Sequence, residues 1–212
     1  KGGTSRCVAM INAFKGVVTD YRAPGNRSFK DGLDAQVQAH VGFIVDCRQM
    51  SIGQGNFVKY LRMEISKIDP SLSDEEARSH ITHKLAEYLN ERILFPHDVI
   101  ADDGASKVTD GDVILTFSRS TLVEDALKRA HDNGVAFRVI VVDARPQLDG
   151  KVMLTELVRY GLSCTYAHLH SLSYVMKEVS KVFCGAYALL SNGSVVSRVG
   201  TAAVGLAASA NR

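Results

Sequence analysis

Through the first hundred positions, apolar side chains recur at alternating steps of three and four residues. The first series runs through Cys7, Met10, Phe14, Val17 and Tyr21. Two further series with the same spacing begin at residues 33 and 58. This spacing places the apolar side chains on one face of a helix, so the pattern predicts a helical domain at the start of the chain.

A fourth helix has a clearly marked beginning. Ser73 followed by Glu76 is a capping box, in which each side chain bonds the backbone N–H of the other residue. Asp74 and Glu75 place negative charge at the helix N-terminus, where the helix dipole favours it. We expect Pro96 to kink or end this helix, because proline lacks an N–H and its ring crowds the preceding turn.

After residue 111 the period changes. Short apolar runs with many β-branched residues predict buried strands over residues 112–117, 137–143, 163–169 and 186–191. Helical patterns lie between them, at 120–133, 153–160 and 174–181. Strands that alternate with helices in this way predict a parallel sheet with right-handed crossovers. The fold class is therefore α/β, with the boundary between the two parts near residues 104–111.

Composition narrows the functional classes. The net charge of +2 is small and the basic residues are scattered, which argues against a nucleic-acid surface. No apolar stretch is long enough to cross a bilayer, and no leader for secretion precedes the first helix. The four cysteines are far apart, as is usual for free thiols in the cytosol. We expect a cytoplasmic protein that binds neither nucleic acid nor membrane.

Two kinds of site are disfavoured by the motifs that the chain lacks. The turn over residues 117–121 contains no glycine, so no dinucleotide fingerprint follows the first strand, and no phosphate-binding P-loop occurs anywhere. His80 and His83 lie one helical turn apart, and His168 and His170 share one face of a strand end. Neither pair has a third ligand at a suitable spacing, so we expect no metal and no cofactor.

Two segments, residues 142–150 and 192–201, carry a more specific signal. We expect both at the carboxyl edge of the sheet, where open α/β sheets bind ligands. Asn192-Gly193 suits a left-handed turn after the fourth strand, and the loop then brings Arg198 to a helix N-terminus that seats an anion. In the alternative interpretation, both segments are turns and caps whose arginines pair with nearby carboxylates. The candidate anion-binding residues are Arg119, Arg145, Asn192, Gly193, Arg198, Gly200 and Thr201.

The motifs D-A-R-P-x-x-x-G at residue 143 and N-G-S-V-x-S-R-V-G-T at residue 192 resemble the signature segments of one superfamily. It joins the alpha, beta and delta subunits of the guanine-nucleotide exchange factor for the eukaryotic translation-initiation GTPase to sugar-phosphate isomerases. The resemblance covers nearly the whole chain, and residues 5–10, 48–65 and 178–193 look delta-like. It implies a helical domain over 1–104 and a Rossmann-like domain over 105–212.

The chain also looks like a fragment. It begins without a methionine and ends just after an alanine-rich helical pattern, where an α/β domain normally adds another strand. We therefore expect the Rossmann-like domain to be truncated at its C-terminal end.

The superfamily has two branches, the exchange-factor subunits and the isomerases, and this chain departs from the isomerase pattern at two positions. The isomerases of this superfamily resemble T-x-C-N-[TA]-G after the first strand, and Ser118 stands in place of the cysteine. Their catalytic aspartate lies in G-A-D-x-[VI]-x-x-N-G, and Tyr187 takes its place. A phenol titrates near pH 10 and cannot replace a carboxylate in moving a proton between sugar carbons. The prediction is a non-catalytic regulatory subunit, with a sugar-phosphate isomerase or metabolite binder as the alternative. The phosphate-binding lysine of the isomerases aligns with Arg198.

The resemblance also implies partners. Relatives pair through the α/β domain, delta with beta, in an assembly that also holds the alpha, gamma and epsilon subunits. Epsilon carries the exchange activity, while delta senses the phosphorylated alpha subunit of the GTPase. On the outer face of the first helix, Lys15 and Arg22 are the cations expected to meet a phosphoserine. In the alternative interpretation this face is simply solvated.

Overall fold

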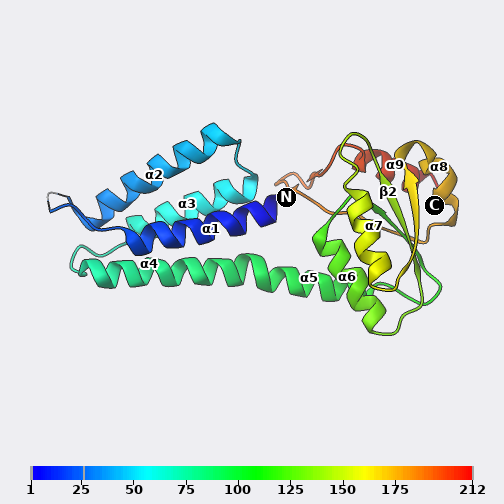
Figure 1. Cartoon of the computed structure of the whole chain (residues 1–212), viewed down its shortest axis with the longest axis horizontal. Helices are drawn as coiled ribbons and strands as arrows, with labels where there is room; N and C mark the ends of the chain where they lie inside the picture. The colour runs from blue at the N-terminus through cyan, green and yellow to red at the C-terminus, as the bar shows by residue number, and fades with distance from the viewer. Residues whose placement is uncertain (1, 26, 212) are drawn as a thin grey trace. The chain divides into compact units, whose positions relative to one another are not determined.

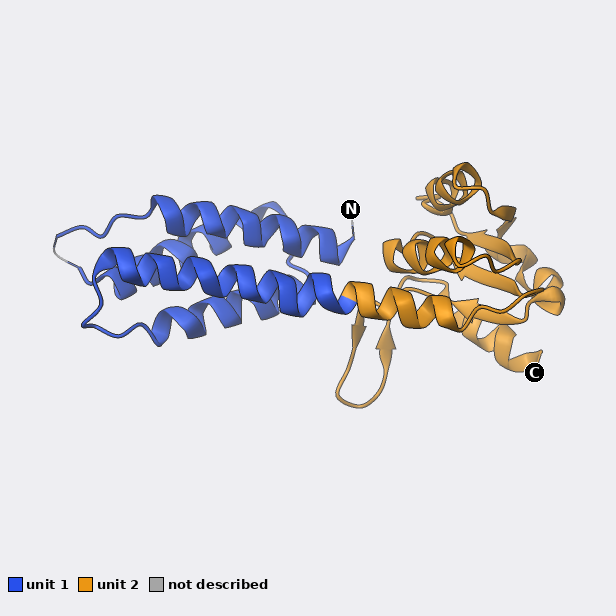
Figure 2. Ribbon diagram, turned by 90° about the horizontal axis from the view of Figure 1, so that it is seen from below, with its two compact units in different colours: residues 1–96 blue, residues 97–212 orange. Residues whose placement is uncertain are grey.

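The structure, a computed structural model, describes residues 2–25 and 27–211. It divides into two compact units, residues 1–96 and 97–212 (Figure 2). The first unit is helical, and its long helices are α1 (Gly3–Asp20), α2 (Phe29–Cys47), α3 (Ile52–Ser66) and α4 (Asp74–Leu89) (Figure 1). The second unit holds the parallel sheet, so the predicted α/β class is confirmed.

The predicted apolar faces of the helices meet in one core. Phe14, Leu33 and Leu61 are almost completely buried there, which matches the faces predicted for α1, α2 and α3. The prediction is wrong at Cys47, which is exposed. The last two turns of α2 lie largely at the surface, so its apolar stripe extends beyond the part that packs on the core.

The capping box of α4 is confirmed, because Ser73 accepts from the backbone of Glu76 and Glu76 accepts from that of Ser73. The helix does not end at Pro96, however. A π-helical turn, η1 (Asn90–Leu94), precedes α5 (Phe95–Ser106), which places the proline in the first turn of α5. The helical turns run on through this point, since the Phe95 N–H donates to the Asn90 carbonyl in the π-helical pattern. The predicted boundary at residues 104 and 105 falls inside α5 and stays a prediction.

The sheet of the second unit has four parallel strands in the order β3-β2-β1-β4. Its strands are β1 (Val113–Phe117), β2 (Arg138–Asp143), β3 (Ser163–His168) and β4 (Lys181–Phe183). The helices are α6 (Thr121–Asp132), α7 (Gly150–Arg159), α8 (Leu172–Val175) and α9 (Thr201–Ala210), with short 3₁₀ turns η2 (Leu169–Ser171) and η3 (Met176–Glu178).

Two apolar layers enclose the sheet, since successive side chains of a strand point to opposite faces. Ile114 and Val139 pack with residues of α6 and α7, whereas Leu115 and Ile140 pack with residues of α8 and α9. The unit is therefore a three-layer α/β/α fold (Figure 1). Because all four strands run in parallel, the loops that follow them meet at one edge, and the candidate site lies there.

One predicted strand is wrong. The fourth parallel strand is Lys181–Phe183, which begins where the predicted helix 174–181 was expected to end. The segment 186–191 lies outside the main sheet. That segment instead supplies β5 (Ala188–Leu189), which pairs antiparallel with β6 (Val195–Val196) in a separate hairpin. The segment was expected to be a buried strand, but the hairpin lies largely at the surface, where Leu189 is 73% exposed.

Candidate functional site at the carboxyl edge of the sheet

Ser118 begins the site directly after β1. Its φ of 58° is in the left-handed region, which few residues other than glycine adopt. This conformation turns the chain at the end of the strand while the Ser118 amide still donates to the Val142 carbonyl at 2.7 Å. The side chain is buried, and its hydroxyl points to the next group of the site, Arg198.

Arg198 connects the loops that follow β1 and β2. Its Nη1 donates to Oδ2 of Asp149 at 2.5 Å and to Oγ of Ser118 at 3.1 Å. The two charged side chains are each about two-fifths exposed, so water screens the pair. The positive charge of Arg198 is thus met by a carboxylate of the chain itself, as in the alternative interpretation of this loop.

The start of α9 completes the edge. Gly200 is its N-cap, with φ of 108°, and gives no side-chain cap to the first amides of the helix. A Cβ at this position would lie 2.5 Å from Cζ of Phe117, the last residue of β1. Ser197 donates to the Gly185 carbonyl at 2.6 Å and bonds the Thr201 hydroxyl at 3.1 Å. The helix N-terminus therefore packs directly on the end of β1, close to Arg198.

A buried carboxylate lies beside this edge. Asp143 ends β2, and its Oδ2 accepts from the Tyr166 hydroxyl at 3.0 Å. Burial and this hydrogen bond raise the pKa of Tyr166, so the phenol stays a donor at neutral pH. A Cβ at Gly150 would lie 2.6 Å from Cγ of Asp143, so α7 can begin against the carboxylate only with glycine there. These contacts hold the loop that carries Asp149.

Four other predicted site residues are not drawn into this cluster. Arg119 lies after β1, but its Nε is 3.5 Å from Glu124 of α6. Arg145 is exposed, and among the described residues it makes no hydrogen bond. Asn192 and Gly193 form the tip of the β5–β6 hairpin, with Asn192 accepting from the Ser194 amide at 3.0 Å. The hairpin separates this pair from the sheet, so its expected place after the fourth parallel strand is wrong.

Sequence reasoning did not nominate three groups of this site: Asp143, Asp149 and Tyr166. The two acids are part of the D-A-R-P segment, and an acid that ends an otherwise apolar strand is the signal for Asp143. Nothing in the local sequence points to Tyr166, which reaches Asp143 only because β3 pairs with β2.

The helical unit holds the two predicted partner-binding cations. Arg22 is exposed, and its Nη1 donates to the carbonyls of Thr19 at 2.8 Å and Tyr21 at 2.9 Å, at the C-terminus of α1. A cation is favourable at that end of a helix. Lys15 is half-buried and makes no hydrogen bond or ion pair through its side chain within the described ranges.

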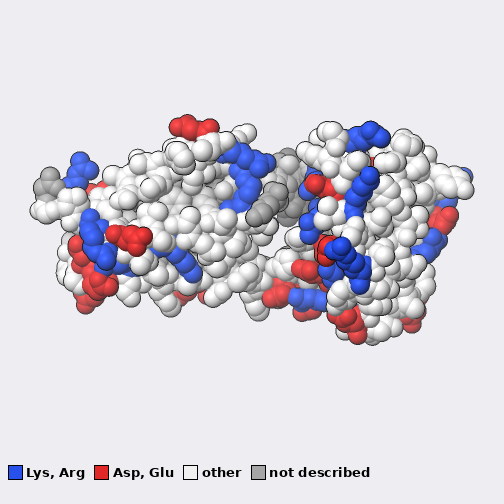
Figure 3. Space-filling model, viewed as in Figure 1, with Lys and Arg blue, Asp and Glu red and all other residues white. Residues whose placement is uncertain are grey.

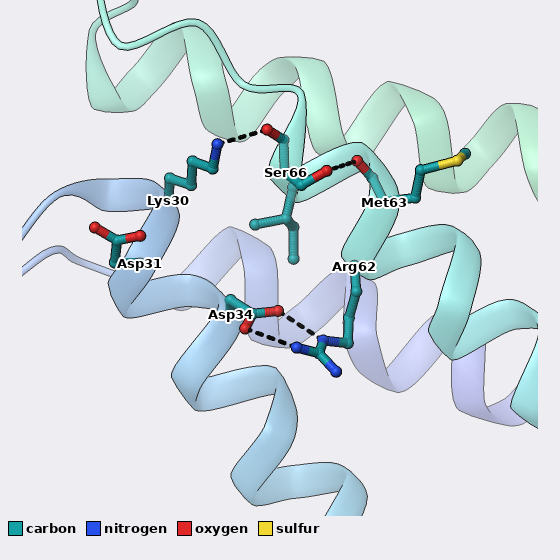
Figure 4. Close-up of a pocket in the computed structure, with 7 residues that line it drawn as sticks. Lys30, Asp31, Asp34, Arg62, Met63 and Ser66 are labelled. Atoms are coloured by element: carbon teal, nitrogen blue, oxygen red, sulfur yellow. Dashed lines mark hydrogen bonds and ion pairs between the residues drawn. The ribbon is translucent and has the colours of Figure 1, made fainter.

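A cleft of about 340 Å³ opens between α2 and α3 of the same unit (Figure 4). Arg62 donates to both carboxylate oxygens of Asp34, at 2.8 and 3.2 Å, and this hydrogen bonding holds the pKa of Asp34 below its ordinary value. Lys30 donates to the Ser66 carbonyl at 2.5 Å. Arg62 and Asp34 thus pair with each other, while Lys30 is bonded to a backbone carbonyl and Asp31 accepts from the Ser28 hydroxyl, so each charged group of this cleft already has a partner in the chain.

Metal and thiol chemistry finds little support in residues 2–25 and 27–211. No group of three His, Cys, Asp or Glu side chains in that part could hold a metal ion. The rings of His168 and His170 stack on each other with centroids 5.4 Å apart. All four cysteines are free, and burial raises the pKa of Cys164 to about 11, which keeps it a thiol at neutral pH.

The distribution of charge and the length of apolar helices bear on binding to nucleic acid and to membranes. On the face shown in Figure 3, basic and acidic side chains are interspersed, with no broad field of one sign. No helix in the described part of the chain is long and apolar enough to cross a membrane.

The chain thus combines a bundle of helices with a Rossmann-like sheet that holds an arginine at its carboxyl edge. Comparison with known proteins shows which family has this architecture. The model of the initiation factor 2 subunit family matches residues 1–212, and the chain belongs to this family. It is 38% identical over 205 residues to translation initiation factor eIF2B subunit delta of Schizosaccharomyces pombe, covering 97% of this chain and 44% of that protein. The same subunit of Dictyostelium discoideum is 40% identical over 203 residues, covering 96% of this chain and 32% of that protein.

A solved structure agrees with these relatives. The crystal structure of the tetrameric eIF2B-beta2-delta2 complex from Chaetomium thermophilum matches with a TM-score of 0.95 at 30% identity, covering 100% of this chain and 68% of the matched one. The predicted resemblance to delta-type subunits is thus confirmed. The chain spans less than half the length of the curated delta relatives.

Isomerases are more distant relatives. Ribose 1,5-bisphosphate isomerase of Pyrococcus furiosus is 36% identical over 113 residues, covering 53% of this chain and 35% of that protein. At the two positions where the isomerase pattern places its cysteine and aspartate, this chain has a buried Ser118 and a Tyr187 that is 47% exposed.

Proposed function

We propose that this chain is part of a non-catalytic regulatory subunit of the guanine-nucleotide exchange factor for the translation-initiation GTPase. The observation that carries the proposal is the 38–40% identity to delta subunits over nearly the whole chain. As a delta-type subunit, it would pair with a beta subunit through the α/β unit and join alpha, gamma and epsilon in the cytosol. This pairing is supported by its structural neighbour, which is a beta2-delta2 complex.

The edge of the sheet supports the absence of catalysis. Moving a proton between sugar carbons needs a base that titrates near neutral pH. Ser118 offers a hydroxyl that accepts a hydrogen bond from the Arg198 guanidinium, and Tyr187 offers a phenol. The guanidinium of Arg198 is already paired with Asp149, so a substrate phosphate would have to displace a carboxylate of the chain. An isomerase is therefore the weaker interpretation of this site.

We further propose that Arg198 keeps a structural role and a weak affinity for anions. Arg198→Ala should lower the free energy of unfolding by about 0.5–1 kcal/mol, since the pair with Asp149 is half-exposed. Phosphate at millimolar concentration should raise the melting temperature of the wild type and not that of the variant. Thermal unfolding with and without phosphate measures both effects.

Arg159→Ala is the matched control, because Arg159 is the last residue of α7, is 74% exposed and forms only a 3.5 Å contact with Glu156. It should leave stability and the phosphate response unchanged. If Arg198→Ala behaves like this control on both counts, Arg198 is an ordinary surface residue.

The regulatory contact is proposed for the helical unit, through Lys15 and Arg22. In the assembled exchange factor, Lys15→Glu combined with Arg22→Glu should weaken binding of the phosphorylated GTPase alpha subunit about tenfold more than binding of the unphosphorylated form. Phosphoserine carries close to two negative charges, which the introduced carboxylates would repel. Surface-immobilised complex and titrated partner give both affinities.

Two controls separate recognition from folding. Arg22→Gln removes the charge but keeps a donor for the Thr19 and Tyr21 carbonyls, so it should preserve the end of α1. Lys59→Glu reverses an exposed charge on α3 and should leave both affinities unchanged. Equal loss for the two partner forms would point to misfolding, and no loss for either would move the contact away from this helix.

A further inference from the structure

The tip of the β5–β6 hairpin carries an asparagine that is followed by glycine. Asn192 and Gly193 are both exposed, and Gly193 has φ of 80°. The Gly193 amide donates to the Leu190 carbonyl at 2.9 Å, which closes a turn over residues 190–193. A side-chain amide and the backbone nitrogen that follows it therefore lie together at the surface, and residue 193 has no Cβ to shield that nitrogen.

The side chain of Asn192 is oriented by this turn. Its Oδ1 accepts a hydrogen bond from the Ser194 amide at 3.0 Å. A backbone N–H in this position draws electron density from the side-chain carbonyl, so Cγ becomes a better target for a nucleophile. The same N–H would stabilise the negative charge that Oδ1 gains during an attack on Cγ, as the donors of an oxyanion hole do. The backbone nitrogen of Gly193 is the nucleophile that the chain itself supplies.

The hairpin does little to hold its turn closed. Strands β5 and β6 have two residues each and, among the described residues, pair only with each other. A hairpin of two strands without further support is marginally stable in water. Opening of the turn breaks the bond between Gly193 and Leu190 at low cost, and this frees the Gly193 amide for reaction.

A second Asn-Gly pair in the chain gives a comparison. Asn133 and Gly134 are also exposed, at the end of α6, and the Gly134 amide donates to the His131 carbonyl at 2.9 Å. Here the next amide, that of Val135, also donates back into α6, to the Ala130 carbonyl at 3.3 Å, and α6 packs on the sheet. The side chain of Asn133 accepts no hydrogen bond within the described ranges. The two pairs thus share dipeptide and exposure, but differ in the donor to the side chain and in the support of the turn.

We propose that Asn192 is a site of spontaneous deamidation. The Gly193 nitrogen bonds to Cγ of Asn192, the bond from Cγ to Nδ2 breaks, and the proton of the Gly193 amide leaves with Nδ2 as ammonia. Water then opens the succinimide ring at either carbonyl, adding its hydroxyl to that carbon and a proton to the nitrogen. No electrons are transferred, and water is the only co-reactant. The products are aspartate and isoaspartate, in which the backbone runs through the side-chain carboxyl carbon.

Both products change the hairpin. Residues 182–197 contain no charged side chain, so deamidation places a carboxylate in an otherwise uncharged segment. Isoaspartate also lengthens the backbone within the turn, and turn length fixes the register of a hairpin. The pairing of Leu189 with Val195 should therefore be lost in that product. This chemistry is independent of the proposed role in nucleotide exchange.

Incubation of the full chain at neutral to mildly alkaline pH, followed by peptide mapping, tests the site. Tryptic peptides 182–198 and 130–138 carry the two asparagines separately, and mass spectrometry counts the replaced amides. Asn192 should deamidate about tenfold faster than Asn133. Gly193→Ala should slow the reaction at Asn192, because a methyl group shields the attacking nitrogen. Asn192→Gln should abolish it in the same peptide, because the longer side chain would have to close a larger ring.

The unfolded chain separates the effect of structure from that of sequence. In denaturant the turn and the Ser194 donor are lost, so Asn192 and Asn133 should react at similar rates. Equal rates in the folded chain would overturn the proposal, and so would a preference for Asn192 that is the same with and without denaturant.

Asn192→Asp tests the consequence, because it adds the charge without lengthening the backbone. Hydrogen exchange of residues 187–196 should be faster in the isoaspartate product than in this variant. Equal exchange in the two would overturn the expected loss of register.

Discussion

Replacing Asp112 by alanine is expected to lower the free energy of unfolding of the α/β unit by about 2–4 kcal/mol. Asp112 precedes β1, is 7% exposed, and accepts hydrogen bonds from Thr109, Ser180 and Lys181. The bond from Lys181 Nζ is 2.6 Å long and joins the start of β4 to the start of β1. Alanine would leave these donors without their acceptor, and the short strand β4 would lose its main anchor.

The same carboxylate makes the unit sensitive to acid. Burial alone would raise the pKa of Asp112, but hydrogen bonds from Lys181, Ser180 and Thr109 outweigh it and hold the pKa well below its ordinary value of 3.8. A depressed pKa in the folded state means that the stabilisation is fully present above about pH 5 and is lost progressively as the pH falls through the ordinary pKa toward the lower one of the folded state. Asp112→Asn should lack this part of the acid dependence.

Denaturant unfolding between pH 3 and pH 7, followed by circular dichroism, measures both effects. Hydrogen exchange of residues 113–117 and 181–183 localises them to the β1–β4 pair. Asp103→Ala is the control, because Asp103 is 68% exposed and its pair with Lys107 is 3.3 Å long. That change should stay within about 0.5 kcal/mol. An equally small effect for Asp112→Ala would contradict its role as an anchor.

Gly200→Ala should cost about 2–4 kcal/mol of unfolding free energy, the other large effect expected, because a backbone penalty and a steric penalty add at this position. A φ of 108° is a strained conformation for any residue with a Cβ, and the new methyl group would lie 2.5 Å from the Phe117 ring. Either α9 or the ring would have to move, and the contact between the helix and the end of β1 would open.

Two other glycines separate these penalties. Gly193 has φ of 80°, and a methyl group added there would meet nothing within 4 Å, so Gly193→Ala should show only the conformational cost, about 1 kcal/mol. Gly205 is inside α9 with open space around it, and Gly205→Ala should stabilise by about 0.5–1 kcal/mol. Thermal melts of the three variants test this order. A Gly200→Ala variant no less stable than Gly193→Ala would mean that α9 does not press on β1.

Most elements were predictable because burial imposes a period on the sequence. The helices of the first unit show one apolar face. Strands β1 and β2 are apolar apart from Thr116, Arg138 and Asp143, because both of their faces are covered. The fourth parallel strand was not predictable in this way, because a strand of three residues that begins with Lys181 is too short to show a hydrophobic pattern. The apolar residues near Leu189 imitate a buried strand, yet they lie on an exposed hairpin.

The candidate site was predictable only in part. The loop motifs and the parallel topology indicate the carboxyl edge, and Arg198, Gly200 and Thr201 do lie there. The identity of the partner of Arg198 depends on tertiary structure, because Asp149 is 49 positions away in sequence.

The bond between Arg198 and Asp149 has an evolutionary consequence. An arginine that depends on a free ligand can be lost as soon as the ligand is lost, because selection no longer retains it. When a carboxylate of the same chain is its partner, loss of either residue leaves the other unpaired, so selection retains both. Once one of them has changed, the other is no longer constrained. In descendants of this sequence, positions 149 and 198 should therefore mutate together, as a linked acid–base pair.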